Sequence, residues 1–545
     1  MTIARPAGLC YYCRMDSTDS RRDSRWILTI DAGGSGIRAT AVNTDGQAFA
    51  MFRRKLSPLP GPDGAVEFDP ETVWTIVLEA TKGLFLEHPD LKQPDAVAVT
   101  VQRATFCLWE EGTGKPVTKL ISWSDVRSME TAAGMNRSLV WRIIRLAAGI
   151  AGRISGNAFL RAASMLRFTT VHVSCRLKAL LDRNPAIREA CRDGSLRFGT
   201  LDTWLLYRMS GGRQWITDTS NAAATGLYNP FKLKWNRLFC RLFNIPVSIL
   251  PPVRDSIDDF GTTDPEVFAG VEAPVKALVG DQMAALFGHR CFDPGEVKVS
   301  KGSGSFVTIN VGSRPRFSPR GLFPLIAWSI QGKVTYMLEG QVASVGTLIN
   351  WLSSEIGFAD SPEELDALAE EAADSGGVIF LPTPLGIRFP YFRSGMRCAV
   401  FGLGLGTKRS QIARAMYEGI AFRVREIIQG IEKDLGVEVK QLKVDGGVSR
   451  STILMRLLSA SCGIPVLRSP EQELSSVGAA CMAGLGALWW SSEDELRDIP
   501  LQYEVFSNPR EEELFDREYP RWRLAVHLAH RYSGGSRRCP NFTDT

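Results

Sequence analysis

The chain has 545 residues, of which 44% are apolar and 23% are charged, and its formal net charge is +5. This composition is typical of a globular protein and excludes a disordered, collagen-like or fibrous chain. Because a single core stops growing at roughly 250 to 300 residues, we expect two sizeable domains. So small a charge excess argues against a nucleic-acid-binding protein, which usually carries a strongly basic domain.

The eleven cysteines show no metal-ligand spacing apart from the lone pair Cys10 and Cys13, and no histidine lies near that pair. We therefore expect reduced thiols and a cytoplasmic protein, without a zinc site. No window of 18 uncharged apolar residues occurs, so we predict no membrane-spanning helix. Residues 1–25 are polar and turn-rich, which predicts a disordered tail, although their arginines without glutamate also leave a transit peptide open. A second tail is expected from about Ser533.

Between the tails, short apolar runs alternate with longer helical patterns, which is typical of an α/β protein. The predicted strands are Trp26–Ile30, Ala96–Val101, Val275–Val279, Val378–Leu381 and Leu442–Val444. The predicted helices are Glu71–Leu86, Gln411–Leu435 and Thr452–Ser461.

The first predicted strand runs through Asp31 into the turn Gly33-Gly34-Ser35-Gly36, and a second strand follows from Ile37. Glycines permit a tight turn and a close backbone approach to an anion. The turn is neither a Walker loop, since no Gly-Lys-Ser/Thr follows, nor a dinucleotide loop, which would open a helix. We interpret it as a β-hairpin phosphate loop with Asp31 as a candidate for a magnesium role; the alternative is an ordinary hairpin turn.

The same pattern of strand, Gly/Ser turn and strand recurs over residues 298–310, around Gly302-Ser303-Gly304. Two such hairpins in one chain favour a duplicated nucleotide-binding fold in which each domain offers one loop to the phosphates.

Two further turns carry candidate chemistry. Asp281 leaves a strand directly after Gly280, where a carboxylate can sit in a cleft and accept a proton from a substrate hydroxyl. The alternative for Asp281 is a helix N-cap. The turn Asp445-Gly446-Gly447 opens a helix, and its flat backbone can lie against an adenine or ribose; the alternative is a plain turn.

The order of these elements resembles the FGGY carbohydrate kinase family over about residues 26–510, and within it the glycerol kinases. The motifs that carry the resemblance are Gln102-Arg103, Trp109, Thr113–Pro116, Ser122-Trp123 with Arg127, Gly199–Leu205, Thr217–Ala222, Gly280–Gln282, Gly404–Gly406 with Glu418-Gly419, Asp445–Gly447, and Val477–Ala480 with Ala483–Leu485. Two phrases, Gln102–Phe106 and Leu250–Asp255, are similar to a divergent animal subgroup of glycerol kinases.

The resemblance implies an α/β protein of two duplicated actin/Hsp70-like (ribonuclease H-like) ATPase domains, with the active site in the cleft between them. The expected N-terminal domain, residues 26–290, contains the substrate side and the first phosphate loop. The expected C-terminal domain, residues 291–512, contains the second phosphate loop and the adenosine site, and a helix and tail follow at 513–545.

The implied activity is the ATP-dependent phosphorylation of a small polyol, glycerol to sn-glycerol 3-phosphate, with ATP and Mg²⁺. Carried over by position, Asp281 is the general base and Asp31 orients the metal. The implied substrate-binding residues are Arg103, Trp123, Asp281 and Gln282. The implied nucleotide-binding residues are Ser35, Arg38, Ser303, Gly346, Asn350, Gly447 and Ser451.

Three positions depart from the glycerol kinase pattern. Ala104 stands where those enzymes carry Glu, Val171 where they carry Tyr, and Ser451 where they carry Asn. A methyl group cannot accept a hydrogen bond from a polyol, and each lost contact costs roughly 1 to 3 kcal/mol. The alternatives are therefore a kinase of a different sugar or polyol, or a nucleotide-binding regulatory protein with weakened catalysis.

The positive charge is concentrated in residues 131–170, which contain six arginines and no Asp or Glu. The apolar, arginine-rich stretch 139–166 has the character of a helical insertion relative to glycerol kinases. A contact with an anionic membrane surface or an acidic partner through residues 137–167 is one interpretation, and packing on its own domain with solvated arginines is the other. The charge is not evidence for nucleic acid. Homo-oligomers are common among glycerol kinases, so the resemblance also allows one here.

Overall fold

The first half of the chain is built on a mixed β-sheet whose strand order is β14-β6-β1-β2-β3. Its strands are β1 (Trp26–Ala32), β2 (Gly36–Asn43), β3 (Ala48–Lys55), β6 (Ala96–Val101) and β14 (Val275–Gly280). The hairpin strands β1, β2 and β3 are antiparallel, whereas β1, β6 and β14 are parallel. The computed structural model describes residues 25–533 except 303, 343–344, 394 and 472, so the two expected tails lie almost wholly outside the described residues.

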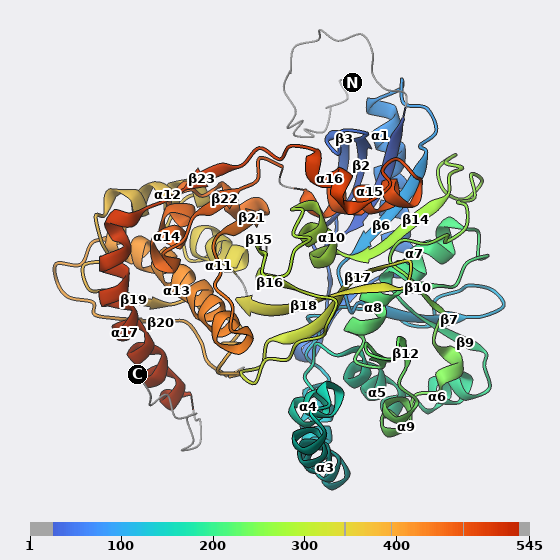
Figure 1. Ribbon diagram of the computed structural model, residues 1–545, viewed down its shortest axis with the longest axis horizontal. Helices are drawn as coiled ribbons and strands as arrows, with labels where there is room; N and C mark the ends of the chain where they lie inside the picture. The colour runs from blue at the N-terminus through green and yellow to red at the C-terminus, as the bar shows by residue number, and fades with distance from the viewer. Residues whose placement is uncertain (1–24, 303, 343–344, 394, 472, 534–545) are drawn as a thin grey trace, which may run out of the picture.

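The second half repeats this design in a sheet of order β17-β18-β16-β15-β21-β22-β23. Its strands are β15 (Val297–Lys301), β16 (Ser305–Gly312), β17 (Phe323–Ile330), β18 (Lys333–Val342), β21 (Leu442–Asp445), β22 (Val466–Arg468) and β23 (Glu504–Phe506). Again, β15, β16 and β18 are antiparallel neighbours in the sheet. On the other side of β15 the sheet continues with the parallel strands β21 and β22. The first sheet and strands β21, β22 and β23 of the second lie in separate lobes, and β17 and β18 extend from one lobe to the other (Figure 1). The duplicated two-domain α/β fold is confirmed.

Helices cover both faces of the first sheet because its central strands are apolar on both sides. Leu28 and Ile30 of β1 pack with α1 (Pro70–Glu87) and α7 (Leu201–Met209). The alternate residue Ile27 packs with α10 (Asp281–Gly288) and α15 (Leu474–Gly486) on the other face.

In the second lobe, strand β21 packs against α13 (Arg409–Leu435) and α14 (Thr452–Cys462). Local signals set the helix ends. Ser451 accepts a hydrogen bond from the Leu454 amide to begin α14, and Gly463, at φ +68°, ends it.

The remaining elements extend these lobes. The first half adds β4 (Leu59–Pro60), β5 (Val66–Phe68), β7 (Phe106–Glu110), β8 (Leu120–Ile121), β9 (Leu196–Thr200), β10 (Thr217–Asp218), β11 (Tyr228–Asn229), β12 (Lys234–Trp235), β13 (Val253–Arg254), α2 (Met129–Arg137), α3 (Leu139–Ser155), α4 (Ala158–Met165), α5 (Val173–Arg183), α6 (Pro185–Arg192), α8 (Thr219–Ala224) and α9 (Arg237–Phe243). The second half adds α11 (Val345–Asn350), α12 (Pro362–Glu371), β19 (Ile379–Leu381), β20 (Ala399–Phe401), α16 (Glu493–Asp498) and α17 (Pro509–Tyr532).

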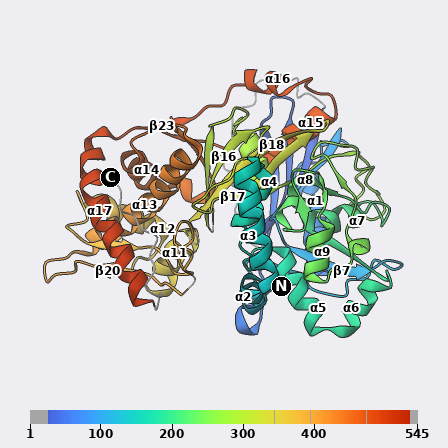
Figure 2. The ribbon, with the colours of Figure 1, turned by 60° about the horizontal axis from the view of Figure 1, so that its bottom comes forward.

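Every strand and helix predicted from the sequence is present, with ends that differ by a few residues. Both Gly/Ser turns connect antiparallel strands, as predicted. Helices α3 and α4 form a hairpin that projects from the body of the molecule (Figures 1 and 2). Within the described part of the chain, no helix has the length and apolar character needed to cross a membrane.

Helix α15 belongs to the last part of the chain, yet it covers the first sheet and lies beside β1 and β6 (Figure 1). It packs on α10 with the two backbones in direct contact. A Cβ atom on Gly478 would lie 1.8 Å from the carbonyl oxygen of Ala284, and one on Gly288 would lie 2.5 Å from that of Leu474. Only glycine at these two positions allows the helices to approach this closely.

We therefore expect Gly478→Ala to lower the free energy of unfolding by about 1 to 3 kcal/mol, the usual cost of overpacking a core. Denaturant unfolding followed by circular dichroism measures this change. The matched control is Gly134→Ala in α2, where no atom lies within 4 Å of the added methyl group. Equal stability of the two variants would contradict this account of the contact between α10 and α15.

Candidate active site

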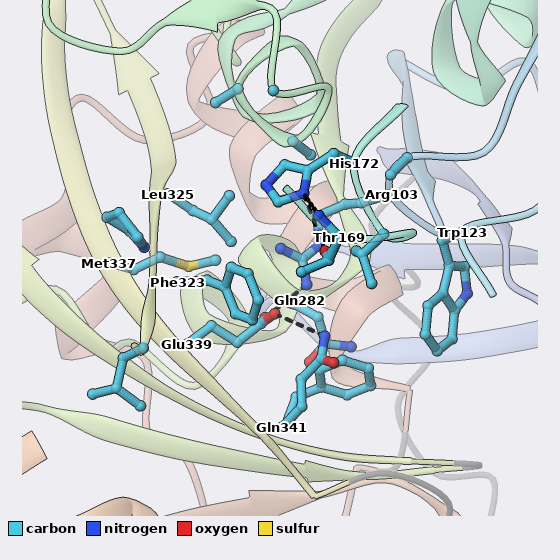
Figure 3. Close-up of a pocket in the computed structure, with 18 of the residues that line it drawn as sticks. Arg103, Trp123, Thr169, His172, Gln282, Phe323, Leu325, Met337, Glu339 and Gln341 are labelled. Carbon is cyan, nitrogen blue, oxygen red and sulfur yellow. Dashed lines mark hydrogen bonds and ion pairs between the residues drawn. The ribbon is translucent and has the colours of Figure 1, made fainter. Parts of the chain in front are cut away.

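A cavity of about 1180 Å³ is lined by residues from both halves of the chain. It contains the first glycine turn, the Gln102-Arg103 pair, Asp281 with Gln282, the second hairpin and the Asp445 turn. Figure 3 shows part of its lining, with Arg103 and Glu339 pointing toward one another and Trp123 on the opposite side from Leu325 and Met337. The structure thus brings together motifs that are far apart in the sequence.

The first hairpin presents Asp31 and Arg38 to the cavity. The Gly33 amide donates to the Gly36 carbonyl and closes the turn between β1 and β2. Asp31 is buried at the end of β1, where its carboxylate accepts a hydrogen bond from the Ser475 hydroxyl at 2.7 Å and lies 3.6 Å from the Arg38 guanidinium. Arg38 also pairs with Glu473 at 2.9 Å. The residues that lead into α15 therefore hold this loop in place.

Arg103 lies between two carboxylates. Its Nη2 donates to Glu339 of β18 at 2.6 Å, and its Nε lies 3.8 Å from Asp281. The stem of Arg103 passes over Gly280, where a Cβ atom would be only 2.5 Å from the Arg103 Cγ. Gly280 is thus required for Arg103 to reach both acids.

Asp281 is the first residue of α10, and the N-cap is Gly280, so the N-cap alternative for Asp281 is wrong. Its Oδ1 accepts the Gln282 amide at 2.8 Å. Burial raises the pKa of Asp281, and the charge of Arg103 opposes this rise. A partly buried carboxylate of raised pKa at a cavity wall is suited to accept a proton.

The second hairpin reaches the cavity through Ser300, Gly302 and Gly304. Lys298 lies two residues before Ser300, on the same face of the strand, and is fully buried. It donates hydrogen bonds to Gln282 Oε1 and to Ser300 Oγ, both at 2.7 Å. Burial lowers the pKa of this ammonium group. Lys298 therefore links the second hairpin to the start of α10. The predicted site residue Ser303 lies outside the described residues.

The third turn lines the cavity with Asp445, Gly446 and Gly447. Gly446 adopts φ +86°, and a Cβ atom there would lie 2.6 Å from the Lys301 carbonyl oxygen, so this turn packs directly on the second hairpin. Gly346 joins the same group, because its amide donates to the Gly302 carbonyl at 3.1 Å.

Three predicted nucleotide residues, Gly346, Asn350 and Ser451, are not part of the cavity lining. Asn350 is exposed at the end of α11. Ser451 is buried, caps α14, and donates to Asp366 at 2.8 Å. Their nucleotide-binding roles stay predictions, and the contacts of Ser451 are those of a helix cap.

The proposed substrate side of the cavity combines aromatic side chains with Ala104 and Val171, two of the positions that depart from the glycerol kinase pattern. Trp123 meets Phe306 edge to face, with ring centroids 6.2 Å apart. Ala104, at φ +60°, and Val171 line the cavity as predicted from their positions. Phe323 and Leu325 of β17 add further apolar surface (Figure 3).

One buried arginine that the sequence analysis missed organises this side. Arg176 of α5 donates to the carbonyls of Ala104 at 2.7 Å, Ser122 at 2.6 Å and Val171 at 2.8 Å. Burial lowers its pKa to about 9, which leaves it cationic at neutral pH. It fixes three substrate-side loops that are distant in sequence.

Glu339 and Lys298 were also missed. The sequence signal was a charged residue within a strand, which does not reveal its partner. Gln102 belongs to the quoted motifs but was given no role; its amide atoms are buried in the cavity wall without a hydrogen-bond partner. Such an unsatisfied amide can be paired by an incoming ligand.

Comparisons with known proteins identify the family of the chain. Residues 26–288 match the model of the FGGY family of carbohydrate kinases, N-terminal domain, and residues 297–487 match that of the C-terminal domain. Glycerol kinase 5 of Danio rerio is 36% identical over 88% of this chain and 90% of its own length. Glycerol kinase of Symbiobacterium thermophilum is also 36% identical, over 92% of this chain and 98% of its own length.

Solved structures of kinases share the fold of this chain. Plasmodium falciparum glycerol kinase with ADP has a TM-score of 0.82 at 27% identity and covers 93% of this chain and 98% of its own. A Lactobacillus acidophilus xylulose kinase, at 18% identity, shares the fold with a TM-score of 0.76, covering 94% of this chain and 99% of its own. With both family models matched in order across its two halves, the chain belongs to the FGGY family of carbohydrate kinases.

Proposed function

We propose that this kinase transfers the γ-phosphoryl group of ATP to a hydroxyl group of a small polyol, glycerol being the first candidate, to give sn-glycerol 3-phosphate. The observation that carries the proposal is the position of Asp281 at the cavity wall, between Arg103 and the second hairpin. Relatives named glycerol kinase over nearly the whole chain support glycerol as the substrate.

In the proposed reaction, the oxygen of a polyol hydroxyl group bonds to the γ-phosphorus of ATP, and ADP leaves. Asp281 accepts the proton of that hydroxyl group. Arg103 and Gln282 hold the polyol, and Trp123 contacts its carbon chain. A raised pKa suits Asp281 to this role, and a modest base is sufficient because phosphoryl transfer depends mainly on positioning and charge neutralisation.

On the nucleotide side, Ser35 and Arg38 of the first hairpin, Ser303 of the second, and Gly447 of the third turn are proposed to bind ATP, with Gly346, Asn350 and Ser451 as further contacts. Mg²⁺ prefers one or two carboxylates together with phosphate oxygens. The buried carboxylate of Asp31, at the base of the first hairpin, fits that donor set. The ion would neutralise charge on the transferring phosphoryl group.

We propose that the protein is cytoplasmic because its described cysteines are free thiols. The eight cysteines of the described residues are free, and six of them are buried. Reduced thiols are the rule in the cytosol. The domain limits at residues 290 and 512 and a homo-oligomeric state stay predictions.

A kinase of a larger polyol or a sugar is the second candidate, because Ala104 and Val171 withhold two polar contacts. The test is a coupled ADP-release assay with Mg-ATP across glycerol, longer polyols and pentuloses. We expect polyol-dependent ADP release that falls at least about 100-fold in Asp281→Asn, the usual scale of a lost general base.

The matched control for that substitution is Asp255→Asn, a carboxylate outside the cavity lining, which we expect to leave the rate unchanged. Equal ADP release by wild type and Asp281→Asn with every acceptor would contradict the role of Asp281. ATP binding without transfer to any acceptor would favour the regulatory alternative.

Because Ala104 cannot accept a hydrogen bond from a polyol, we expect a substitution that restores an acceptor there to improve glycerol binding. Ala104→Glu restores a hydrogen-bond acceptor at a position that already holds a Cβ atom at φ +60°. If glycerol is the substrate, its KM should fall about tenfold, which corresponds to one recovered hydrogen bond. Ala104→Leu adds bulk without an acceptor and should not lower the KM. An unchanged KM in Ala104→Glu would rule out this explanation.

A further inference from the structure

Helix α3 is attached to the body by one face only. Trp141 is 1% exposed and packs with ring centroids 4.7 Å from Phe168 and 5.6 Å from Phe239, and Ala148 and Gly152 lie on the same buried side. These contacts hold the helix firmly, so its outward face is a defined feature of the fold.

The outward face of α3 is aliphatic where a surface helix is normally polar. Six of its side chains are between 54% and 83% exposed: Leu139, Val140, Ile143, Leu146, Ile150 and Ile154. Apart from Val140, they recur at intervals of three and four residues and so form one stripe along the helix. We call these six residues the α3 stripe.

Positive charge borders the α3 stripe along one edge. Arg142 and Arg153 are exposed on α3, and their helical angles place both on that edge. Arg137, Arg161 and Arg167, before and after the helix, are exposed as well. Since residues 131–170 contain no Asp or Glu, the hairpin supplies no carboxylate to neutralise them.

We propose that the hairpin of α3 and α4 docks on an anionic lipid surface, with the α3 stripe buried at the level of the acyl chains and the arginines at the headgroups. An aliphatic face flanked by arginines is typical of helices that lie in a membrane interface. Each arginine near an anionic leaflet adds to the attraction. This proposal goes beyond the phosphoryl transfer proposed above and does not depend on it.

The shape and charge of the hairpin favour lipid over protein. The hairpin projects from the body (Figures 1 and 2), so a protein partner would need a matching groove, whereas a fluid bilayer adapts to it. The α3 stripe has none of the aromatic anchors that dominate protein interfaces. A second copy that paired through the same face would bring two sets of arginines together.

The docking surface is continuous with one wall of the cavity. Met165, Leu166, Arg167 and Phe168, at the end of α4 and just after it, line the cavity. A docked hairpin would therefore hold the cavity close to the lipid surface.

Flotation of the full chain with vesicles tests the proposal. Vesicles of phosphatidylcholine with about 30% phosphatidylserine should bind at least about tenfold more protein than vesicles of phosphatidylcholine alone. High salt should weaken this binding, because it screens the arginines. Leu146→Gln/Ile150→Gln and Arg142→Gln/Arg153→Gln should each reduce binding to anionic vesicles about tenfold.

The matched control is Leu86→Gln/Leu524→Gln, which changes two exposed leucines on α1 and α17 and should bind like wild type. Unchanged circular dichroism melts of all variants show that folding is not the cause. Absence of wild-type flotation, or equal flotation of the stripe variant and wild type, overturns the proposal. Sedimentation velocity supplies a further test: a wild-type dimer that Leu146→Gln/Ile150→Gln converts to a monomer would assign the α3 stripe to a second copy and also overturn it.

Discussion

The contact between α10 and α15 is the constraint on which the site depends. These two helices come from different halves of the chain, and glycines at 288 and 478 let their backbones touch. The start of α10 carries Asp281, and the residues that lead into α15 supply Glu473 and Ser475 to Arg38 and Asp31. One helix pair therefore sets the distance between the first hairpin and the proposed base.

The charges around Asp281 form a balanced set. Arg103 joins Asp281 to Glu339, and Lys298 joins Gln282 to the second hairpin. Burial raises the pKa of Asp281 and lowers the pKa of Lys298, and the opposite charges beside each group act against these shifts. Glu339 in particular places a second carboxylate beside Arg103, in a site where Ala104 removes the acid that glycerol kinases carry. The acidic group beside Arg103 in the cavity lining therefore comes from β18, and the residue after Arg103 is Ala104.

Local features of the sequence predicted much of the fold. The two Gly/Ser turns between β-branched strands identified both hairpins, and the apolar runs identified the central strands of both sheets. Asp281 was identified because a carboxylate directly after a buried strand and a glycine is an informative local pattern. Ser451 caps α14, a role that its residue type favours, and its nucleotide-binding role stays a prediction.

What the sequence could not predict are the long-range partners. Arg176 resembles any arginine of an amphipathic helix, and only the fold shows that it holds the loops of Ala104, Ser122 and Val171. The return of α15 to the first sheet likewise depends on packing between segments that are hundreds of residues apart. The apolar and basic character of 139–166 was visible in the sequence, but which side chains face outward required the structure.

A crystal structure of the protein with Mg-ADP and glycerol is the most direct test of the central claim. We predict a glycerol hydroxyl oxygen within about 3.2 Å of the Asp281 carboxylate, the reach of a general base. We also predict the ADP phosphates between the two hairpins, with the metal on the side of Asp31. Glycerol bound away from Asp281, or phosphates that contact neither hairpin, would contradict the account.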